Sequence, residues 1–256
     1  MPRRDDDPDF VEAVARGLDV LKAFGPDRPR MTLAEVAART GLARPTARRI
    51  LRTLIALGYV RADDPAFALT PRVLELGFSY LSALSLPEIV QPHLEALSHR
   101  VDEYVSAAVL DGADIVYIAR VATRRIMSVR ITIGTRFPAY ATSMGRVLLA
   151  GIPDAARAAL LAASTPAHLT DKTLTGADLT AELDRVRAQG WAMVDGELEP
   201  GLRSIAAPVH GRDGEIVGAL NVSTSTNRVD VTRVRGVYLP ALRETAAAVD
   251  AELRLV

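Results

Sequence analysis

The 256-residue chain contains no cysteine. This excludes disulfide bonds, thiolate zinc sites and cysteine nucleophiles, and it favours a protein of the reducing cell interior. The first residues, 1–9, are not followed by the apolar segment of a secretion signal. The sequence also lacks an apolar run of about 20 residues, the length that spans a bilayer. We therefore expect a cytoplasmic protein without membrane association.

Common catalytic patterns are missing as well. The sequence has no Gly-x-Ser-x-Gly elbow, no His-Glu-x-x-His pair, no P-loop and no Gly-x-Gly-x-x-Gly. Its four histidines lack the spacing of metal ligands: His93, His99, His168 and His210. We expect neither an enzyme nor a bound metal or cofactor.

The net charge is zero, with 31 basic and 31 acidic residues, but the basic residues are unevenly distributed. Residues 28–61 contain eight arginines and a single acidic residue, Glu35. A charge run of this kind is often only a solvated helix face. It supports nucleic-acid binding when the arginines fall on one face of a suitable motif, because phosphate neutralisation is local.

The sequence around these arginines predicts a helix-turn-helix. Apolar residues recur at helical spacing over 10–24. Thr32 and Glu35 form a capping-box pattern at the start of a short second helix. Gly41 suits the tight turn that follows, and Pro45 suits the first turn of a third helix. Segments 58–61 and 66–69 predict two short strands, the wing.

The third helix predicts a DNA-reading surface. Ala47, Ile50, Leu51 and Leu54 form its buried stripe, and the arginines lie on the other sides. Arginine can donate two hydrogen bonds to a guanine edge or grip phosphates. The candidate DNA-binding residues are Arg44, Pro45, Thr46, Arg48, Arg49 and Arg52. The wing carries Asp63 and Asp64, so we expect little phosphate contact from it.

The rest of the chain predicts a larger α+β domain. An apolar helix over 71–86 connects it to the first domain and is a plausible dimer seam. Helical and strand-like segments then mix, with expected strands over 104–110, 115–121, 126–133, 191–195, 203–208 and 216–223 and a closing helix over 231–253. We expect a disordered arm (1–9), a winged helix-turn-helix (10–70), this connecting helix (71–86) and an effector domain (87–256).

Strand alternation selects candidate ligand-binding residues. Ser204 shares a strand face with Ala206, and Asn221 shares one with Ser223. Small polar groups among small apolar ones leave room for a ligand and donors to orient it. Residues 142–145 precede a helix, whose first amides could meet a carboxylate. From the residues alone, these could equally be ordinary turn and cap residues.

An ordered series of motifs resembles the IclR (isocitrate lyase regulator) family of transcription factors over the full length. The motifs are 10–24 (FVEAVARGLDVLKAF), 30–47 (RMTLAEVAARTGLARPTA), 69–80 (LTPRVLELGFSY), 114–121 (DIVYIARV), 126–129 (IMSV), 141–150 (ATSMGRVLLA), 201–206 (GLRSIA) and 219–223 (ALNVS). The chain is most similar to the branch that regulates the β-ketoadipate pathway and hydroxybenzoate catabolism.

The resemblance implies a winged helix-turn-helix, a GAF-like α+β effector domain, and homodimers or homotetramers on double-stranded operator DNA. It implies a pocket for a small aromatic or dicarboxylic acid, such as protocatechuate, 4-hydroxybenzoate or β-ketoadipate. The family's pocket positions fall on Ser143, Met144, Asp195, Ser204, Asn221 and Ser223. Some family members have cysteine at the position of Ser204, so a metal site is not expected here. Arg130 and Arg203 are the basic candidates for the effector's charge. The alternative is an oligomeric DNA-binding regulator without a small-molecule effector.

Overall fold

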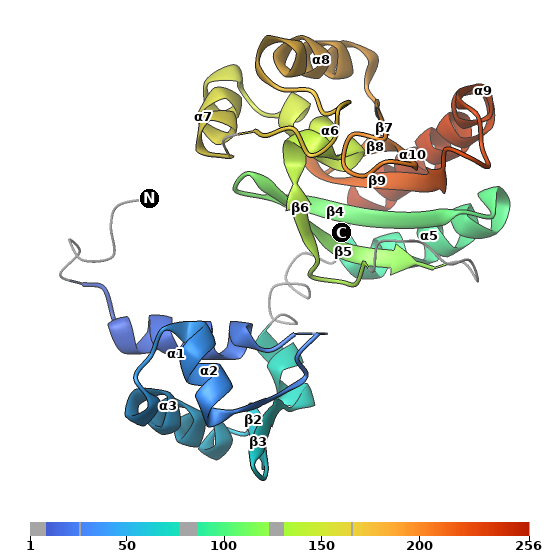
Figure 1. Ribbon diagram of the computed structural model, residues 1–256. Helices are drawn as coiled ribbons and strands as arrows, with labels where there is room; N and C mark the ends of the chain where they lie inside the picture. The colour runs from blue at the N-terminus through green and yellow to red at the C-terminus, as the bar shows by residue number, and fades with distance from the viewer. Residues whose placement is uncertain (1–8, 26, 77–85, 123–130, 165, 256) are drawn as a thin grey trace. The chain divides into compact units, whose positions relative to one another are not determined.

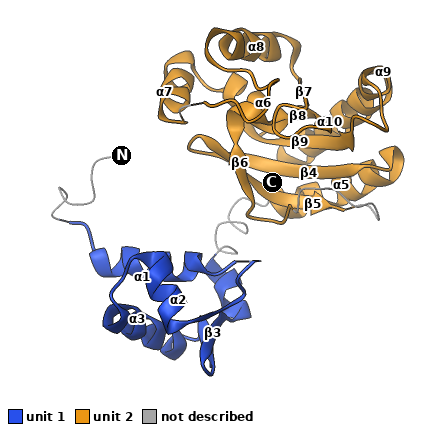
Figure 2. Cartoon of the chain, in the orientation of Figure 1, with its two compact units in different colours: residues 1–83 blue, residues 84–256 orange. Residues whose placement is uncertain are grey.

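The computed structural model describes residues 9–25, 27–76, 86–122, 131–164 and 166–255 (Figure 1). The chain divides into two compact units, residues 1–83 and 84–256 (Figure 2). The expected N-terminal arm lies outside the described residues, except for Asp9. No helix in the described segments is long and apolar enough to cross a membrane.

Three helices form the body of the first unit: α1 (Glu12–Ala23), α2 (Leu33–Thr40) and α3 (Arg44–Ala56). Their apolar faces meet in one core, in which Val20, Val36, Ala47 and Leu51 are fully buried. The predicted stripe of α3 therefore faces the core, with Ile50 only partly buried at its edge. This packing fixes which side of α3 faces outward.

The predicted capping box starts α2. The Thr32 side chain accepts from the Glu35 amide, and the Glu35 carboxylate accepts from the Thr32 amide at 2.7 Å. These hydrogen bonds hold the pKa of the Glu35 carboxyl below its ordinary value. Gly41 ends the helix with φ of 67°, a left-handed conformation that only glycine adopts without cost. The turn between α2 and α3 follows from these residues.

A small antiparallel sheet completes the winged helix-turn-helix. Its strands are β1 (Arg30–Thr32), β2 (Val60–Asp63) and β3 (Ala66–Leu69), in the order β1-β3-β2. The two wing strands confirm the prediction, while β1 was not predicted, because three residues are too few to show alternation. Pro71–Val73 is a 3₁₀ turn that continues as helix over 74–76. Most of the connecting helix expected over 71–86 lies outside the described residues.

The second unit is built on a six-stranded antiparallel sheet with the order β6-β5-β4-β9-β8-β7. The strands are β4 (Tyr104–Asp111), β5 (Asp114–Val121), β6 (Arg136–Pro138), β7 (Ala192–Asp195), β8 (Leu202–His210) and β9 (Ile216–Ser225). Long β8 and β9 pair along their whole length at its centre.

Helices cover both faces of this sheet (Figure 1). One face packs against α5 (Leu86–Val101) and α10 (Leu239–Leu253). The other packs against the 3₁₀ turn Ala139–Ala141 and α6 (Ser143–Gly151), with α7 (Asp154–Ser164) and α8 (Gly176–Gln189) outside. Every residue of α6 from Ser143 to Ala150 is buried, so this helix forms the centre of that layer.

Two predicted elements differ in the structure. The strand expected over 126–133 falls partly on residues outside the described set, and 131–133 are not extended in a sheet. Instead, Thr132 and Thr135 close a turn through backbone and side-chain hydrogen bonds, and the short strand β6 follows it. The closing helix expected over 231–253 is interrupted, since α9 (Val231–Arg233) passes into a π-helical turn at Val234–Tyr238 before α10 begins.

Candidate DNA-binding surface and ligand cavity

The outward side of α3 is an array of unpaired cations. Arg44, Arg48, Arg49 and Arg52 are all exposed. None of these four guanidinium groups has a hydrogen-bond or ion-pair partner within the described segments. Free cations on one side of the second helix of a helix-turn-helix are what phosphates and guanine edges require.

The other predicted DNA contacts lie beside these arginines. Pro45 is exposed in the first turn of α3, and Thr46 is half-buried. The wing differs in its charge: Arg30 and Arg61 both lie next to the Asp63 carboxylate, at 3.4 and 3.2 Å. One carboxylate thus faces two exposed guanidinium groups in this sheet, whereas the four arginines of α3 have no ion-pair partner within the described residues.

In the second unit, four of the predicted ligand-binding residues surround one cavity. Ser204 on β8 and Asn221 and Ser223 on β9 face Ser143 at the start of α6. The remaining lining residues are Tyr117, Ile131, Ala141, Thr142, Val194, Leu198 and Leu202. The cavity is small, about 20 Å³. Its walls combine hydroxyl and amide groups with apolar side chains, which is typical of a site for a small amphiphilic molecule.

The polar groups of the cavity form two short-range pairs. The hydroxyls of Ser143 and Ser204 lie 2.8 Å apart, and the Asn221 amide donates to the Ser223 hydroxyl at 3.0 Å. The carbonyl oxygen of the Asn221 side chain is buried, and no described residue donates a hydrogen bond to it. A buried unpaired acceptor is costly, so this amide is a natural partner for a donor on a ligand.

The start of α6 is fixed against the turn that precedes it. The Thr142 side chain caps the helix by accepting from the Gly145 amide at 3.0 Å. A Cβ atom on Gly145 would lie 2.1 Å from the Ala139 carbonyl oxygen. The glycine of the 141–145 segment is therefore required by close backbone packing, and it positions Ser143 at the cavity.

A buried ion pair joins α6 to the segment that covers the cavity. The Arg146 guanidinium binds both carboxylate oxygens of Glu197 and also donates to the Tyr140 carbonyl at 2.9 Å. Glu197 in addition accepts from the Leu174 amide at 3.1 Å. Leu198, next in sequence, lines the cavity. The sequence analysis did not single out Arg146, because an arginine within an apolar helix gives no sign of its partner.

Met144 and Asp195, the two other predicted residues, do not line this cavity. Met144 is buried within α6. Asp195 pairs with Arg203 in the strand register, whereas its neighbour Val194 pairs with Ser204. Because side chains alternate along a strand, Asp195 and Arg203 face the other side of the sheet. The two form an ion pair at 2.8 Å, so Arg203 is already neutralised. Arg130 lies outside the described residues.

Tyr117 is a cavity residue that strand alternation alone would not reveal. Ala107 pairs with Ala119 and Ala108 pairs with Tyr117, so β5 has one extra residue at Ile118. This β-bulge shifts the alternation and turns Tyr117 toward the cavity. Burial raises the pKa of Tyr117 to about 12, so its hydroxyl remains a neutral hydrogen-bond donor at physiological pH.

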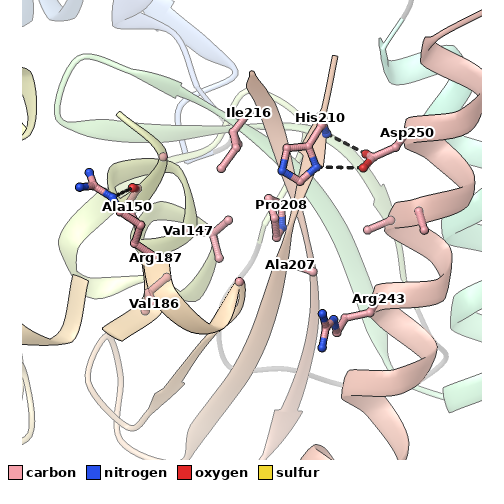
Figure 3. Close-up of a pocket in the computed structure, with 14 residues that line it drawn as sticks. Val147, Ala150, Val186, Arg187, Ala207, Pro208, His210, Ile216, Arg243 and Asp250 are labelled. Atoms are coloured by element: carbon pink, nitrogen blue, oxygen red, sulfur yellow. Dashed lines mark hydrogen bonds and ion pairs between the residues drawn. The ribbon is translucent and has the colours of Figure 1, made fainter. Parts of the chain in front are cut away.

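A second, larger cavity of about 300 Å³ lies at the C-terminal end of β8, beyond its pairing with β7, and is lined by residues of α6, α8 and α10 (Figure 3). Its polar groups are mostly occupied. The Asp250 carboxylate accepts from the His210 backbone amide at 2.7 Å and contacts the ring at 2.9 Å, and Arg187 donates to the Ala150 carbonyl. The exposed Arg243 lies at its rim. These contacts stabilise the end of the sheet and leave few groups for a ligand.

The described residues contain no group of three or more His, Asp or Glu side chains able to hold an ion. Ligand recognition by hydroxyl, amide and guanidinium groups is the chemistry that the second unit offers.

Comparison with known proteins gives a consistent result over both units. Residues 78–251 match the family model "Bacterial transcriptional regulator IclR C-terminal", and residues 13–64 match the "IclR helix-turn-helix domain". Among curated relatives, the "Pca regulon regulatory protein" of Pseudomonas putida is 44% identical, with 92% of this chain and 82% of that protein covered. The "p-hydroxybenzoate hydroxylase transcriptional activator" of Acinetobacter baylyi is 38% identical, with 93% and 90% covered.

A solved structure shares this architecture. It is that of an IclR homolog from Microbacterium hydrocarbonoxydans complexed with 4-hydroxybenzoate, which is 26% identical with a TM-score of 0.85 and covers 95% of this chain and 100% of its own. The match covers both the helix-turn-helix unit and the unit that holds the six-stranded sheet. The chain therefore belongs to the IclR family of bacterial transcriptional regulators.

Proposed function

We propose that this regulator binds operator DNA through α3 and changes its DNA binding when an aromatic acid enters the cavity beside α6. The cavity of Ser143, Ser204, Asn221 and Ser223 carries the proposal. A family member of the same fold binds 4-hydroxybenzoate, and curated relatives are named for the pca regulon and for p-hydroxybenzoate hydroxylase. A hydroxybenzoate combines an apolar ring with polar groups at its ends, which matches the mixed walls.

Ligand entry requires the cavity to expand. Its volume of about 20 Å³ accommodates about one water molecule, whereas a protein cavity that takes up benzene measures about 150 Å³. Leu198, in the loop before β8, and Leu202, at the start of β8, line the cavity, and Glu197 ties this loop to α6. An aromatic acid must displace these side chains outward. The ligand thereby prefers a different arrangement of the second unit, which is the condition for a regulatory effect.

On the DNA side, we propose that α3 docks in the major groove, which is supported by its four exposed arginines without partners among the described residues. Recognition helices of dimeric regulators dock into half-sites about one helical turn apart, or a multiple of it. We propose Arg44, Pro45, Thr46, Arg48, Arg49 and Arg52 as the contact surface. The arginines can serve either base readout or phosphate binding, and only base contacts give sequence specificity.

We further propose a homodimer formed through the first unit. Val11, Val14 and Leu18 on or beside α1 are 45–60% exposed. Val14 and Leu18 line an apolar groove that Leu57 and Leu76 extend. Apolar side chains gathered on one surface are typical of interaction sites. Sedimentation analysis should give the mass of a dimer or of a tetramer built from dimers; a monomer at micromolar concentration would contradict this proposal.

The ligand is tested by thermal unfolding of the full-length protein with a panel of aromatic and dicarboxylic acids. A bound compound at about one hundred times its Kd stabilises the native state by about 2.7 kcal/mol, which gives a clear rise in Tm. We expect this rise with 4-hydroxybenzoate or protocatechuate. Absence of a shift with every compound would favour an oligomeric DNA-binding regulator without a small-molecule effector.

A further inference from the structure

The acid group of an aromatic acid needs a partner, and most cations near the cavity are already paired. Arg146 binds Glu197, and Arg203 binds Asp195 on the other face of the sheet. The serines and the asparagine that line the cavity are neutral. A carboxylate placed there without a cation would lose its hydration with little in return. The question is therefore which cation among the described residues faces the same side of the sheet and has no partner there.

Strand pairing places Arg120 on the cavity side of the sheet. Arg120 on β5 lies opposite Ser106 on β4, and Ser106 lies opposite Asn221 on β9. Residues directly opposite in an antiparallel sheet project to the same face. Asn221 lines the cavity, so Arg120 lies in the same row of side chains, two strands away. The bulge at Ile118 turns Tyr117 to this face as well.

Arg120 is held in place without being neutralised. Its guanidinium lies over the Tyr104 ring, 5.1 Å from the centroid, which orients the group without a counter-ion from the described part of the chain. Its Nη1 atom is buried and has no hydrogen-bond partner among the residues that the structure describes. Burial lowers the pKa of Arg120, and the groups that raise it are the hydroxyls of Tyr117 and Tyr104 rather than a carboxylate. Arginine nonetheless stays protonated in proteins.

We propose that Arg120 binds the carboxylate of the aromatic acid, with the Tyr117 hydroxyl beside it, while the ring extends toward Asn221. A planar guanidinium with a free, dehydrated N–H group is suited to a carboxylate and to a half-buried position. The unpaired side-chain oxygen of Asn221 then accepts a hydrogen bond from the ring hydroxyl. Both unpaired buried groups of this face gain partners from one hydroxybenzoate. This inference rests on the proposed function and assigns the ligand's orientation.

The test compares two ligands of the same shape, 4-hydroxybenzoate and the neutral 4-hydroxybenzamide, by titration calorimetry with full-length protein. Wild-type protein should bind the acid at least tenfold more tightly than the amide. Arg120→Gln should weaken acid binding at least tenfold and leave amide binding within about twofold. Arg120→Lys should retain part of the preference for the acid over the amide. Arg100→Gln, an exposed arginine paired with Glu244, removes the same charge elsewhere and should change neither affinity.

The outcomes separate this inference from the proposed function. A folded Arg120→Gln protein that keeps the wild-type preference for the acid overturns the role of Arg120 and leaves the aromatic-acid effector standing. Equal weakening of acid and amide also overturns it, because Arg120 would then only support the shape of the cavity. If wild-type protein binds neither compound nor any related acid, both the proposed effector class and the role of Arg120 are overturned. Circular dichroism and Tm establish that each variant is folded.

Discussion

The hydroxyl groups of Ser143 and Ser204 lie 2.8 Å apart, and they join the first turn of α6 to strand β8. Two hydroxyls share one hydrogen in this contact, so the pair retains one donor and several acceptor sites. A ligand that enters between them exchanges this contact for its own hydrogen bonds. The residues of α6 are buried against the sheet, so we expect a displacement of Ser143 to shift this helix.

Ser204→Leu should abolish the response to the effector and leave DNA binding intact. The larger side chain fills a cavity of about 20 Å³ and removes one of its hydroxyls. Ser204→Ala keeps the space and loses one hydrogen bond, so we expect weaker ligand binding by about 1 kcal/mol, roughly fivefold. Ligand-induced thermal shifts and DNA binding are measured for both variants. A wild-type ligand response in Ser204→Leu would exclude this cavity as the site.

Arg49→Ala should weaken operator binding, because its guanidinium is exposed on α3 and has no partner in the described part of the chain. Loss of a base contact should relax specificity at one position by about 1–3 kcal/mol. Loss of a phosphate contact should weaken binding to all DNA sequences alike. It should also lower the slope of log affinity against log salt concentration by about one. Arg212→Ala, an exposed arginine of the second unit, is the matched control and should leave affinity unchanged.

Glu197→Gln should destabilise the protein by about 3–5 kcal/mol, since it leaves the buried Arg146 guanidinium without its counter-ion. Glu244→Gln removes an exposed partner of Arg100 and should cost less than about 1 kcal/mol. Chemical denaturation of the two variants makes the comparison. If the two variants lost similar amounts of unfolding free energy, the buried Arg146–Glu197 pair would not be what holds the loop over the cavity to α6.

Gly145→Ala should lower the stability by about 1–3 kcal/mol, because the new Cβ would meet the Ala139 backbone at 2.1 Å. Gly236→Ala is the matched control, since no atom lies within 4 Å of its Cβ position. It should be neutral or slightly stabilising. If the Gly145→Ala variant has the wild-type Tm and responds normally to ligand, the close packing at the start of α6 is needed neither for stability nor for ligand binding.

The winged helix-turn-helix could be predicted well from the sequence. Its signals are local: Thr32 and Glu35 cap α2, Gly41 forms the turn, and the arginines of α3 alternate with its core positions. Such features depend on residues three or four apart along the chain. Strand β1 was missed because its pairing with β3 joins segments more than 30 residues apart.

The cavity could be predicted only in part. Alternation along β8 and β9 placed Ser204, Asn221 and Ser223 on one face, and the structure shows them on it. It could not place Tyr117 and Arg120 together, because the bulge at Ile118 breaks the alternation of β5. The family pattern suggested Asp195, whereas the strand register pairs it with Arg203 on the other face. Long-range register, rather than residue type, decides these positions.

The most direct test of the account is a titration of effector against a protein–DNA complex. The purified regulator selects its operator from random duplexes, and fluorescence anisotropy then follows binding to that duplex with rising 4-hydroxybenzoate or protocatechuate. We expect one of these acids to change the operator affinity at least fivefold, in wild-type protein but not in Ser204→Leu. Tight, specific operator binding that no aromatic acid alters would contradict an aromatic-acid-responsive regulator.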